Sequence, residues 1–179
     1  MRLMLLLPIG AALLGASASV VAASFHAHGG AECIGESVVD RQFLVYNGYG
    51  VINEDTAGAR IVHCPVTRGD ADQPNSVFVT LYDRHPQQPT GCRVEVSSES
   101  GALFTSADTW ACSSSNKNGC TGADPGLSDS SGFRYRILIN ASQMPTVGGG
   151  ATNPMSIRCT VPPVFQNNRS AITGFFNGE

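Results

Sequence analysis

The sequence predicts an all-β domain, an antiparallel β-sandwich or jelly roll of about eight to nine short strands that is stapled by disulfides. Three observations predict it. Short runs alternate between apolar and polar residues, as expected for strands with one buried and one wet face. Gly, Pro, Asn and Asp separate these runs, and no window of about a dozen residues carries a helical stripe. Six cysteines complete the pattern.

The first predicted strands flank a tight turn. Phe43–Tyr46 and Val51–Asn53 enclose Asn47-Gly48-Tyr49-Gly50. Asn-Gly between apolar runs is a strong hairpin signal, because both central residues of a type I′ turn need a positive φ. Three further strands with clean alternation follow in this half of the chain: Arg60–Val66, Ser76–Tyr82 and Cys92–Ser97. The polar, proline-containing segment 85–89 separates the last two.

The second half continues in the same way. Thr109–Cys112 is a candidate strand, and residues 113–130 form a polar excursion rich in glycine and serine. Two late strands show the best alternation: Phe133–Asn140 and Met155–Val161. Pro162 and Pro163 end the second of these, because proline has no N–H for the ladder. A final strand at Ser170–Phe176 closes the predicted sheet.

The first 23 residues have the layout of a secretory signal peptide. A charged start, Met1-Arg2, precedes an apolar run and then a stretch of small residues that ends at Ala23. The apolar run is too short to cross a bilayer core of about 30 Å as a helix. We therefore expect a signal peptide at residues 1–23 and a single β-sandwich domain at residues 24–179, with no membrane span in the mature chain.

Composition narrows the class of partner. The formal net charge is −3, and charges of both signs are mixed along the chain. This balance is typical neither of nucleic-acid binding nor of a membrane-surface protein. The chain is expected to be exported, to the medium, the cell surface or the periplasm.

The cysteines agree with export. An even number in an oxidising compartment predicts up to three disulfides, and the absence of a Cys-x-x-Cys pair disfavours zinc. The short polar interval between Cys112 and Cys120 is the easiest loop to close. For the other four cysteines the working hypothesis pairs Cys33 with Cys64 and Cys92 with Cys159.

Several short motifs occur together. They are Asn47-Gly48-Tyr49-Gly50, Cys64-Pro65-Val66-Thr67-Arg68, and Cys159-Thr160-Val161-Pro162-Pro163. Together they resemble a group of uncharacterised, single-domain, secreted bacterial proteins, over most of the expected mature chain. The resemblance implies export and a β fold, and it implies no catalytic residue.

The most specific chemical feature is the segment Ser24-Phe25-His26-Ala27-His28-Gly29-Gly30. Cleavage after Ala23 would place His26 third, where an amine, two amides and an imidazole form the square-planar set that Cu(II) prefers. Cleavage after Ala27 would make His28 the first residue, and its amine and ring could bind copper. A second ligand would then come from His63 or His85.

An exported β-sandwich that begins with His28 resembles the lytic polysaccharide monooxygenases, which oxidise chitin or cellulose at a copper centre. That resemblance implies copper as cofactor, but Phe25 would occupy the −3 cleavage position, where a small residue is preferred. The family's other motifs are not recognised in the chain. The default expectation is an unstructured tail that carries two histidines, and no cofactor.

Other catalytic classes find less support. Gly126-Leu127-Ser128-Asp129-Ser130 lacks the second glycine of a nucleophile elbow. Four carboxylates are candidates for glycoside hydrolysis, but nothing in the sequence groups any two of them: Asp83, Glu95, Glu99 and Asp108.

Aromatic residues could instead form a binding face. In a sandwich most strand aromatics are expected to fill the core. Tyr49, in a glycine-rich turn, and Trp110, beside Cys112, are the two candidates for exposed stacking platforms. The leading hypothesis is therefore a non-enzymatic binding or surface-structural domain whose ligand is a glycan or a cell-surface protein. The alternative is a copper-dependent oxidase or monooxygenase that uses His28.

Overall fold

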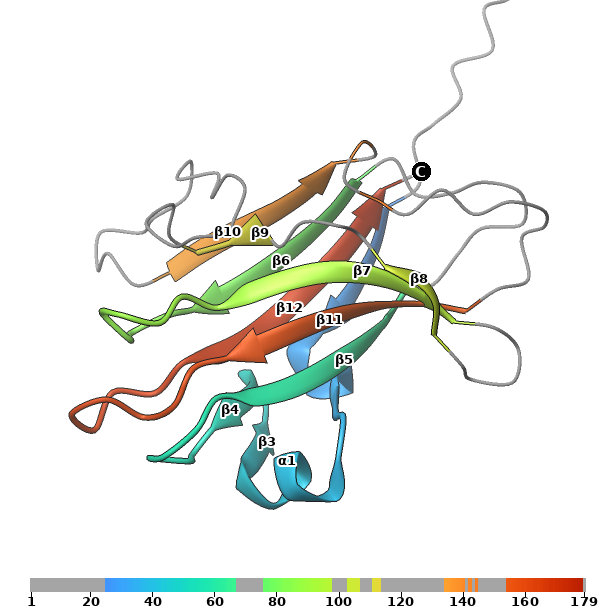
Figure 1. Cartoon of the computed structure of the whole chain (residues 1–179). Coiled ribbons are helices and arrows are strands. Elements are labelled where there is room, and N and C mark those ends of the chain that lie inside the picture. Colours follow the sequence, from blue (N-terminus) through green and yellow to red (C-terminus); the bar gives the residue numbers. More distant parts are fainter. Residues whose placement is uncertain are drawn as a thin grey trace, which may run out of the picture.

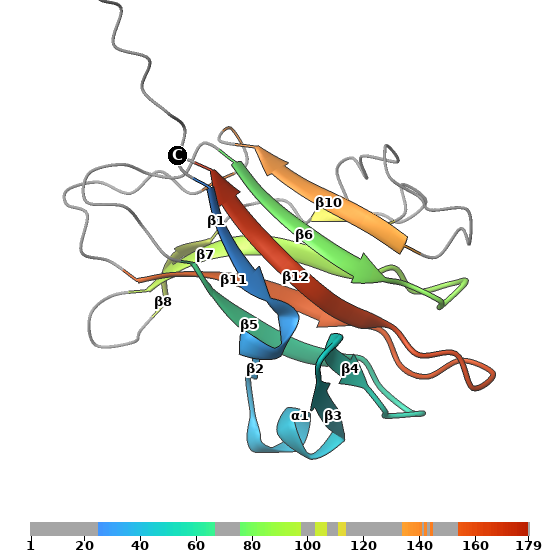
Figure 2. The same cartoon turned by 180° about the vertical axis from the view of Figure 1, so that it is seen from behind.

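The protein is a sandwich of two antiparallel sheets, as Figures 1 and 2 show from opposite sides. The computed structural model describes residues 25–66, 76–97, 103–106, 111–113, 134–140, 142, 144 and 154–178. Within these ranges nearly all regular structure is strand. The predicted all-β, disulfide-stapled fold is confirmed.

Sheet A has the order β10-β6-β12-β4-β3, and β1 also pairs with β12. Its strands are β10 (Arg134–Asn140), β6 (Ser76–Tyr82), β12 (Ala171–Gly178), β4 (Gly50–Asn53), β3 (Leu44–Asn47) and β1 (Phe25–Gly29).

Sheet B has the order β2-β5-β11-β7-β8, and β9 also pairs with β7. Its strands are β2 (Ile34–Gly35), β5 (Arg60–Val66), β11 (Met155–Val161), β7 (Gly91–Ser97), β8 (Leu103–Ser106) and β9 (Ala111–Cys112). Most predicted strands agree with the observed bounds to within one or two residues, whereas β1, β2 and β8 were not predicted.

The core lies between the sheets and consists mainly of valine, isoleucine and leucine. On β6 the alternate residues Val77, Val79 and Leu81 take the core face and are fully buried. Phe78 and Tyr82 consequently face outward and are half-buried. The two aromatic residues of β6 thus depart from the expectation that strand aromatics fill the core, because aliphatic residues occupy the inward positions of this strand.

The predicted hairpin is confirmed, but its turn type is not. Asn47 and Gly50 are partners at the end of β3 and β4, so Gly48 and Tyr49 form the loop. Neither has a positive φ; among the described glycines only Gly50 does, at 126°. A Cβ on Gly50 would lie 1.9 Å from the carbonyl oxygen of Ile172, so close approach of β12 requires glycine there.

A short helix, α1 (Val38–Phe43), and a 3₁₀ helix, η1 (Gly30–Glu32), were not predicted. Ser37 caps α1: its Oγ accepts the Asp40 N–H at 3.0 Å, while the Asp40 carboxylate accepts the Ser37 N–H at 3.0 Å. This reciprocal pair is a capping box, whose Ser-x-x-Asp pattern is present in the sequence. The helix has only six residues, too few to produce a helical stripe.

The expected histidine-containing tail is also replaced by regular structure. Strand β1 runs antiparallel to β12 from Phe25 opposite Gly178 to Gly29 opposite Gly174. Backbone pairing of this kind is not visible in a short segment's own alternation.

Two of the proposed disulfides are confirmed. Cys33 is bonded to Cys64, and Cys92 is bonded to Cys159. These bonds favour an oxidising compartment. Cys112 belongs to β9, but its proposed partner Cys120 lies outside the described residues, as does the signal segment 1–23. In the ranges given above, no helix has the length and apolarity to cross a membrane.

A largely buried ionic group links the loop after β4 with α1 and β5. The Arg60 guanidinium contacts the Asp55 carboxylate, lies 4.0 Å from Asp40 Oδ1, and covers the ring of Phe43 at 4.4 Å. Burial alone raises the pKa of Asp40. Hydrogen bonds from Ser37 and Ile61, together with the charge of Arg60, outweigh this effect, so the pKa lies below its ordinary value. The Ala57 N–H is the main cause that lowers the pKa of Asp55.

These two carboxylates make the fold acid-sensitive. Because their folded pKa values lie below the ordinary 3.8, the stability that they contribute is present at neutral pH and is lost as pH falls. We expect the free energy of unfolding to be flat above about pH 5 and to fall progressively below it. Urea unfolding from pH 7 to pH 3 tests this, and Asp40→Asn should reduce the slope. A stability that rose below pH 4 would contradict the assignment.

Candidate functional site

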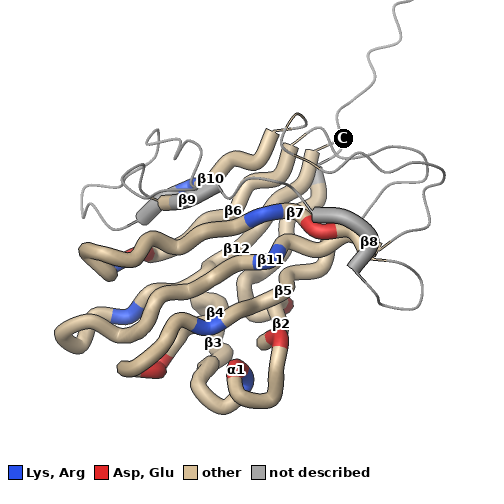
Figure 3. Tube along the Cα trace, viewed as in Figure 1, with Lys and Arg blue, Asp and Glu red and all other residues tan. Residues whose placement is uncertain are grey.

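The outer face of sheet B carries a row of three basic side chains. Arg158 on β11 lies directly opposite His63 on β5 and Arg93 on β7. Like charges in direct opposition destabilise a sheet, so the opposed pair Arg93 and Arg158 needs acidic neighbours. Figure 3 shows basic positions on β7 and β11, and acidic positions on β7 and beside β2.

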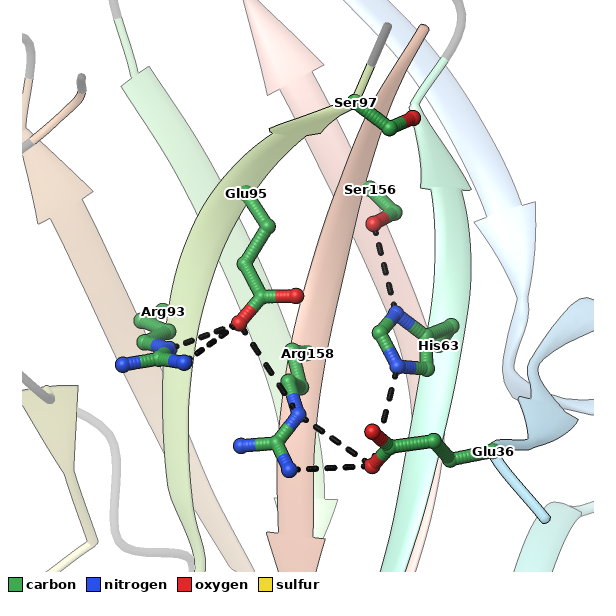
Figure 4. Close-up of a pocket in the computed structure, with 7 residues that line it drawn as sticks. All are labelled: Glu36, His63, Arg93, Glu95, Ser97, Ser156 and Arg158. Carbon is green, nitrogen blue, oxygen red and sulfur yellow. Dashed lines mark hydrogen bonds and ion pairs between the residues drawn. The ribbon is translucent and has the colours of Figure 1, made fainter. Parts of the chain in front are cut away.

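Two carboxylates neutralise the row (Figure 4). Oε1 of Glu95 lies 2.6 Å from Arg93 Nη2 and 3.8 Å from Arg158 Nε. Oε2 of Glu36 lies 2.9 Å from Arg158 Nη2 and 3.8 Å from His63 Nε2. In both carboxylates a single oxygen, Oε1 of Glu95 and Oε2 of Glu36, accepts the hydrogen bonds from the two arginines.

Local structure fixes both acids. Glu95 is part of β7, and its side chain is only 8 % exposed. Glu36 precedes the cap of α1, and its backbone N–H donates to the Ile61 carbonyl at 3.0 Å. The capped helix and the β2–β5 pairing therefore bring an acid from another part of the sequence to the edge of the row.

Hydroxyl groups complete the charged hollow, as we name the concavity of about 500 Å³ on this face. Ser156 Oγ lies 3.4 Å from His63 Nδ1. The residues that line the hollow are Glu36, His63, Arg93, Glu95, Ser97, Ser156 and Arg158. Its volume is in the range of small-molecule sites, about 300–1,000 Å³, but its lining is polar.

Ser156, His63 and Glu36 lie in the order of a hydrolase triad, yet the geometry does not support acyl transfer. The two separations, 3.4 Å and 3.8 Å, are longer than the 2.6–3.2 Å reach of a working nucleophile–base pair. Strand β11 is also paired on both sides, so its own backbone N–H groups serve the ladder and do not form an oxyanion hole beside Ser156. The arrangement instead places charged and hydroxyl hydrogen-bonding groups side by side on one face of the sheet.

Tyr49 is 78 % exposed, the most exposed of the large hydrophobic side chains that the structure describes. It lines a second hollow, on sheet A, together with Tyr82, Arg84 and Arg169. Its role in ligand binding stays a prediction. Trp110, the other predicted platform, lies outside the described residues.

The two histidines of the copper hypothesis lie in β1. His28 stacks on Phe175, with ring centroids 4.7 Å apart, and its Nδ1 lies 2.9 Å from Glu32 Oε2. The hydrogen bond from His28 is the main cause that lowers the pKa of Glu32. His26 lies opposite Asn177 on β12. Cleavage after Ala27 would remove three residues of β1 from this ladder.

The proposed second copper ligands are held elsewhere. His63 faces the charged hollow, whereas His85, in the loop after β6, tilts against Phe165 at 5.2 Å. The described ranges contain no group of three His, Cys, Asp or Glu side chains placed to hold a metal ion.

Of the four candidate carboxylates, two can be placed. Glu95 lines the charged hollow, while Asp83 is a buried hydrogen-bond acceptor between loops. Glu99 and Asp108 lie outside the described residues. The partner of Glu95 across the hollow is Glu36, which the sequence did not single out.

Comparison of the chain with models of protein families, with curated proteins and with solved structures finds no match.

Proposed function

We propose that this chain is an exported, non-enzymatic binding domain that recognises a saccharide in the charged hollow of sheet B. The observation that carries the proposal is the balanced lining of that hollow. Two arginines face two glutamates, and their ion pairs run through Oε1 of Glu95 and Oε2 of Glu36. Serine hydroxyls and an imidazole lie between them.

The lining favours a neutral ligand with many hydroxyl groups. A small anion would meet the carboxylates of Glu36 and Glu95, which already neutralise the guanidinium groups. A sugar hydroxyl can donate to a carboxylate oxygen and accept from a guanidinium, so a ring with several hydroxyls uses both kinds of group. Charge-assisted hydrogen bonds of this type are stronger than those between neutral groups.

Export is part of the same proposal. The signal-like segment 1–23 supports it, and the two disulfides support an oxidising compartment. The resemblance to secreted bacterial single-domain proteins points the same way. The ligand would then be met outside the cytoplasm, where cell-wall and surface glycans are found.

Glu95→Gln tests the site. The amide keeps the size of the side chain but loses the negative charge, so we expect saccharide affinity to fall about tenfold or more, equivalent to about 1.4 kcal/mol. An array of neutral and acidic oligosaccharides would find the ligand, and titration calorimetry would measure its affinity. Ser156→Ala should weaken binding less, and thermal melting would check that each variant is folded.

Thr160→Ala is the matched control. Thr160 is half-buried on β11, two residues from Arg158, and does not line the hollow. Its substitution should leave affinity unchanged. The proposal is overturned if the protein binds no saccharide, or if Glu95→Gln binds saccharide as tightly as the wild type does.

The copper oxidase remains the second candidate, supported by the position of His28 in the sequence. Copper-dependent peroxide production by a chain that begins at His28 would favour it. A mature chain that begins at Ser24 and takes up no copper would exclude it.

A further inference from the structure

We infer that the hollow around Tyr49 on sheet A is a second binding site, and that it takes an acidic sugar, a uronate ring. The inference extends the proposed saccharide function to the opposite face of the sandwich. It rests on that function only for the class of ligand, because different residues form the two sites.

The floor of this aromatic hollow is apolar. Ala171 on β12 lies directly opposite Ile52 on β4 and Tyr82 on β6, so the three side chains form one row across the sheet. Tyr49, from the β3–β4 loop, lines the same hollow. Tyrosine rings offer flat apolar faces with a polar tip, and the C–H face of a sugar ring can lie against such a surface.

The charged residues at the rim of this hollow differ from those of the hollow on sheet B. Arg84 and Arg169 line the aromatic hollow, and none of the lining residues that the structure describes is an aspartate or a glutamate. Arg169 is anchored from outside by Glu54, with Nε 2.6 Å from the carboxylate. Guanidinium groups donate in a fork that matches a carboxylate, whereas the sheet B hollow also presents two carboxylates of its own.

The backbone holds both arginines in place. The Arg84 N–H donates to Ser170 Oγ at 3.1 Å, and the same hydroxyl donates to buried Asp83 at 3.2 Å. Arg169 directly precedes Ser170, so one small hydrogen-bonded unit sets the position of both residues. Ser170 itself is fully buried.

The size of the hollow suits one unit of a longer ligand. It encloses about 190 Å³, less than the sites that enclose whole small molecules. Tyr49 is also open to solvent over most of its surface. A uronate at the end or within a chain could therefore rest on the tyrosines, place its carboxylate at the arginines and leave its neighbours in water.

The experiment is a titration with trigalacturonate and, in parallel, with the neutral galactose trisaccharide of the same length. Tyr49→Ala should weaken trigalacturonate binding at least tenfold, because the exposed ring is the main stacking surface. Tyr49→Phe should retain most of the affinity. Arg169→Gln should weaken trigalacturonate, and Glu95→Gln should leave it unchanged.

The outcomes separate the two proposals. Equal trigalacturonate affinity in Tyr49→Ala and the wild type overturns the inference, as does a preference of this site for the neutral trisaccharide. Loss of trigalacturonate binding in Glu95→Gln alone would place the acidic sugar on sheet B and overturn it too. No binding of trigalacturonate, with neutral saccharides still lost in Glu95→Gln, overturns the inference and leaves the proposed function standing.

Discussion

Replacing Cys92 and Cys159 together with alanine is expected to lower the free energy of unfolding by about 2–4 kcal/mol. The two residues lie directly opposite each other on β7 and β11, and both are fully buried. Their bond closes a chain segment with a sequence separation of 67, against 31 for Cys33 and Cys64. The longer loop restricts the unfolded chain more, so the Cys33–Cys64 double variant should lose somewhat less.

Thermal melting under non-reducing conditions measures the loss, which corresponds to about 5–15 °C for a domain of this size. Adding a reductant to the Cys92→Ala, Cys159→Ala variant should lower its melting temperature further through the remaining Cys33–Cys64 bond. A double variant that melts within a degree or two of the wild type would show that strand pairing alone holds β7 against β11.

The same disulfide is coupled to the charged hollow. Arg93 follows Cys92, and Arg158 precedes Cys159, so the covalent bond lies beside the two opposed guanidinium groups. Opposed like charges favour separation or slippage of the strands. The disulfide fixes the register at this point, and Glu95 neutralises both arginines. The saccharide binding that we propose for sheet B should accordingly weaken when this bond is removed.

The strand pattern could be predicted from the sequence because it depends on local alternation. Val77, Val79 and Leu81 occupy every second position of β6, and the polar or aromatic residues between them face outward. A period of two is visible in one strand alone. The pairing of Cys92 with Cys159 could only be guessed from the sequence, because nothing in either strand shows that β7 and β11 are neighbours; the structure confirms it.

The charged hollow could not be predicted in this way. The alternation of β11 places Ser156 and Arg158 on the polar face, but it does not reveal which residues lie opposite them. Arg93 and His63 meet Arg158 only through the order β5-β11-β7, in which β11 is inserted between strands distant from it in sequence. Glu36 lies next to this row only because it directly precedes Ser37, the cap of the short helix α1. Register between remote strands is a property of the tertiary fold and not of a window of sequence.

Replacing Asp83 with alanine is expected to lower the free energy of unfolding by about 3–5 kcal/mol, because several buried donors lose one acceptor. Asp83 directly follows β6 and is only 7 % exposed. Its Oδ2 accepts the Thr90 N–H at 2.7 Å and the Ser113 hydroxyl, and its Oδ1 accepts the Ser170 hydroxyl at 3.2 Å. One carboxylate thus joins the β6–β7 loop, the residue after β9 and the residue before β12.

Asp83→Asn should be less damaging, with a loss of about 1–3 kcal/mol, because the amide keeps one acceptor oxygen for part of this network. Glu54→Ala is the matched control: it removes an acid from a solvent-exposed pair with Arg169, and such pairs contribute about 0–1 kcal/mol. Urea unfolding of the three variants measures the differences. If Asp83→Ala were no less stable than Glu54→Ala, the buried donors would have to find other acceptors.

Substitution of Asp83 should also weaken ligand binding in the proposed aromatic hollow around Tyr49. Ser170 donates to Asp83 and accepts the Arg84 N–H, so removal of the carboxylate frees the hydroxyl that positions Arg84 and its neighbour Arg169. Trigalacturonate affinity should therefore fall in Asp83→Asn, while neutral saccharide binding at Glu95, on the other sheet, should be retained. Equal loss at both sites would mean that the substitution loosens the whole sandwich and not this one junction.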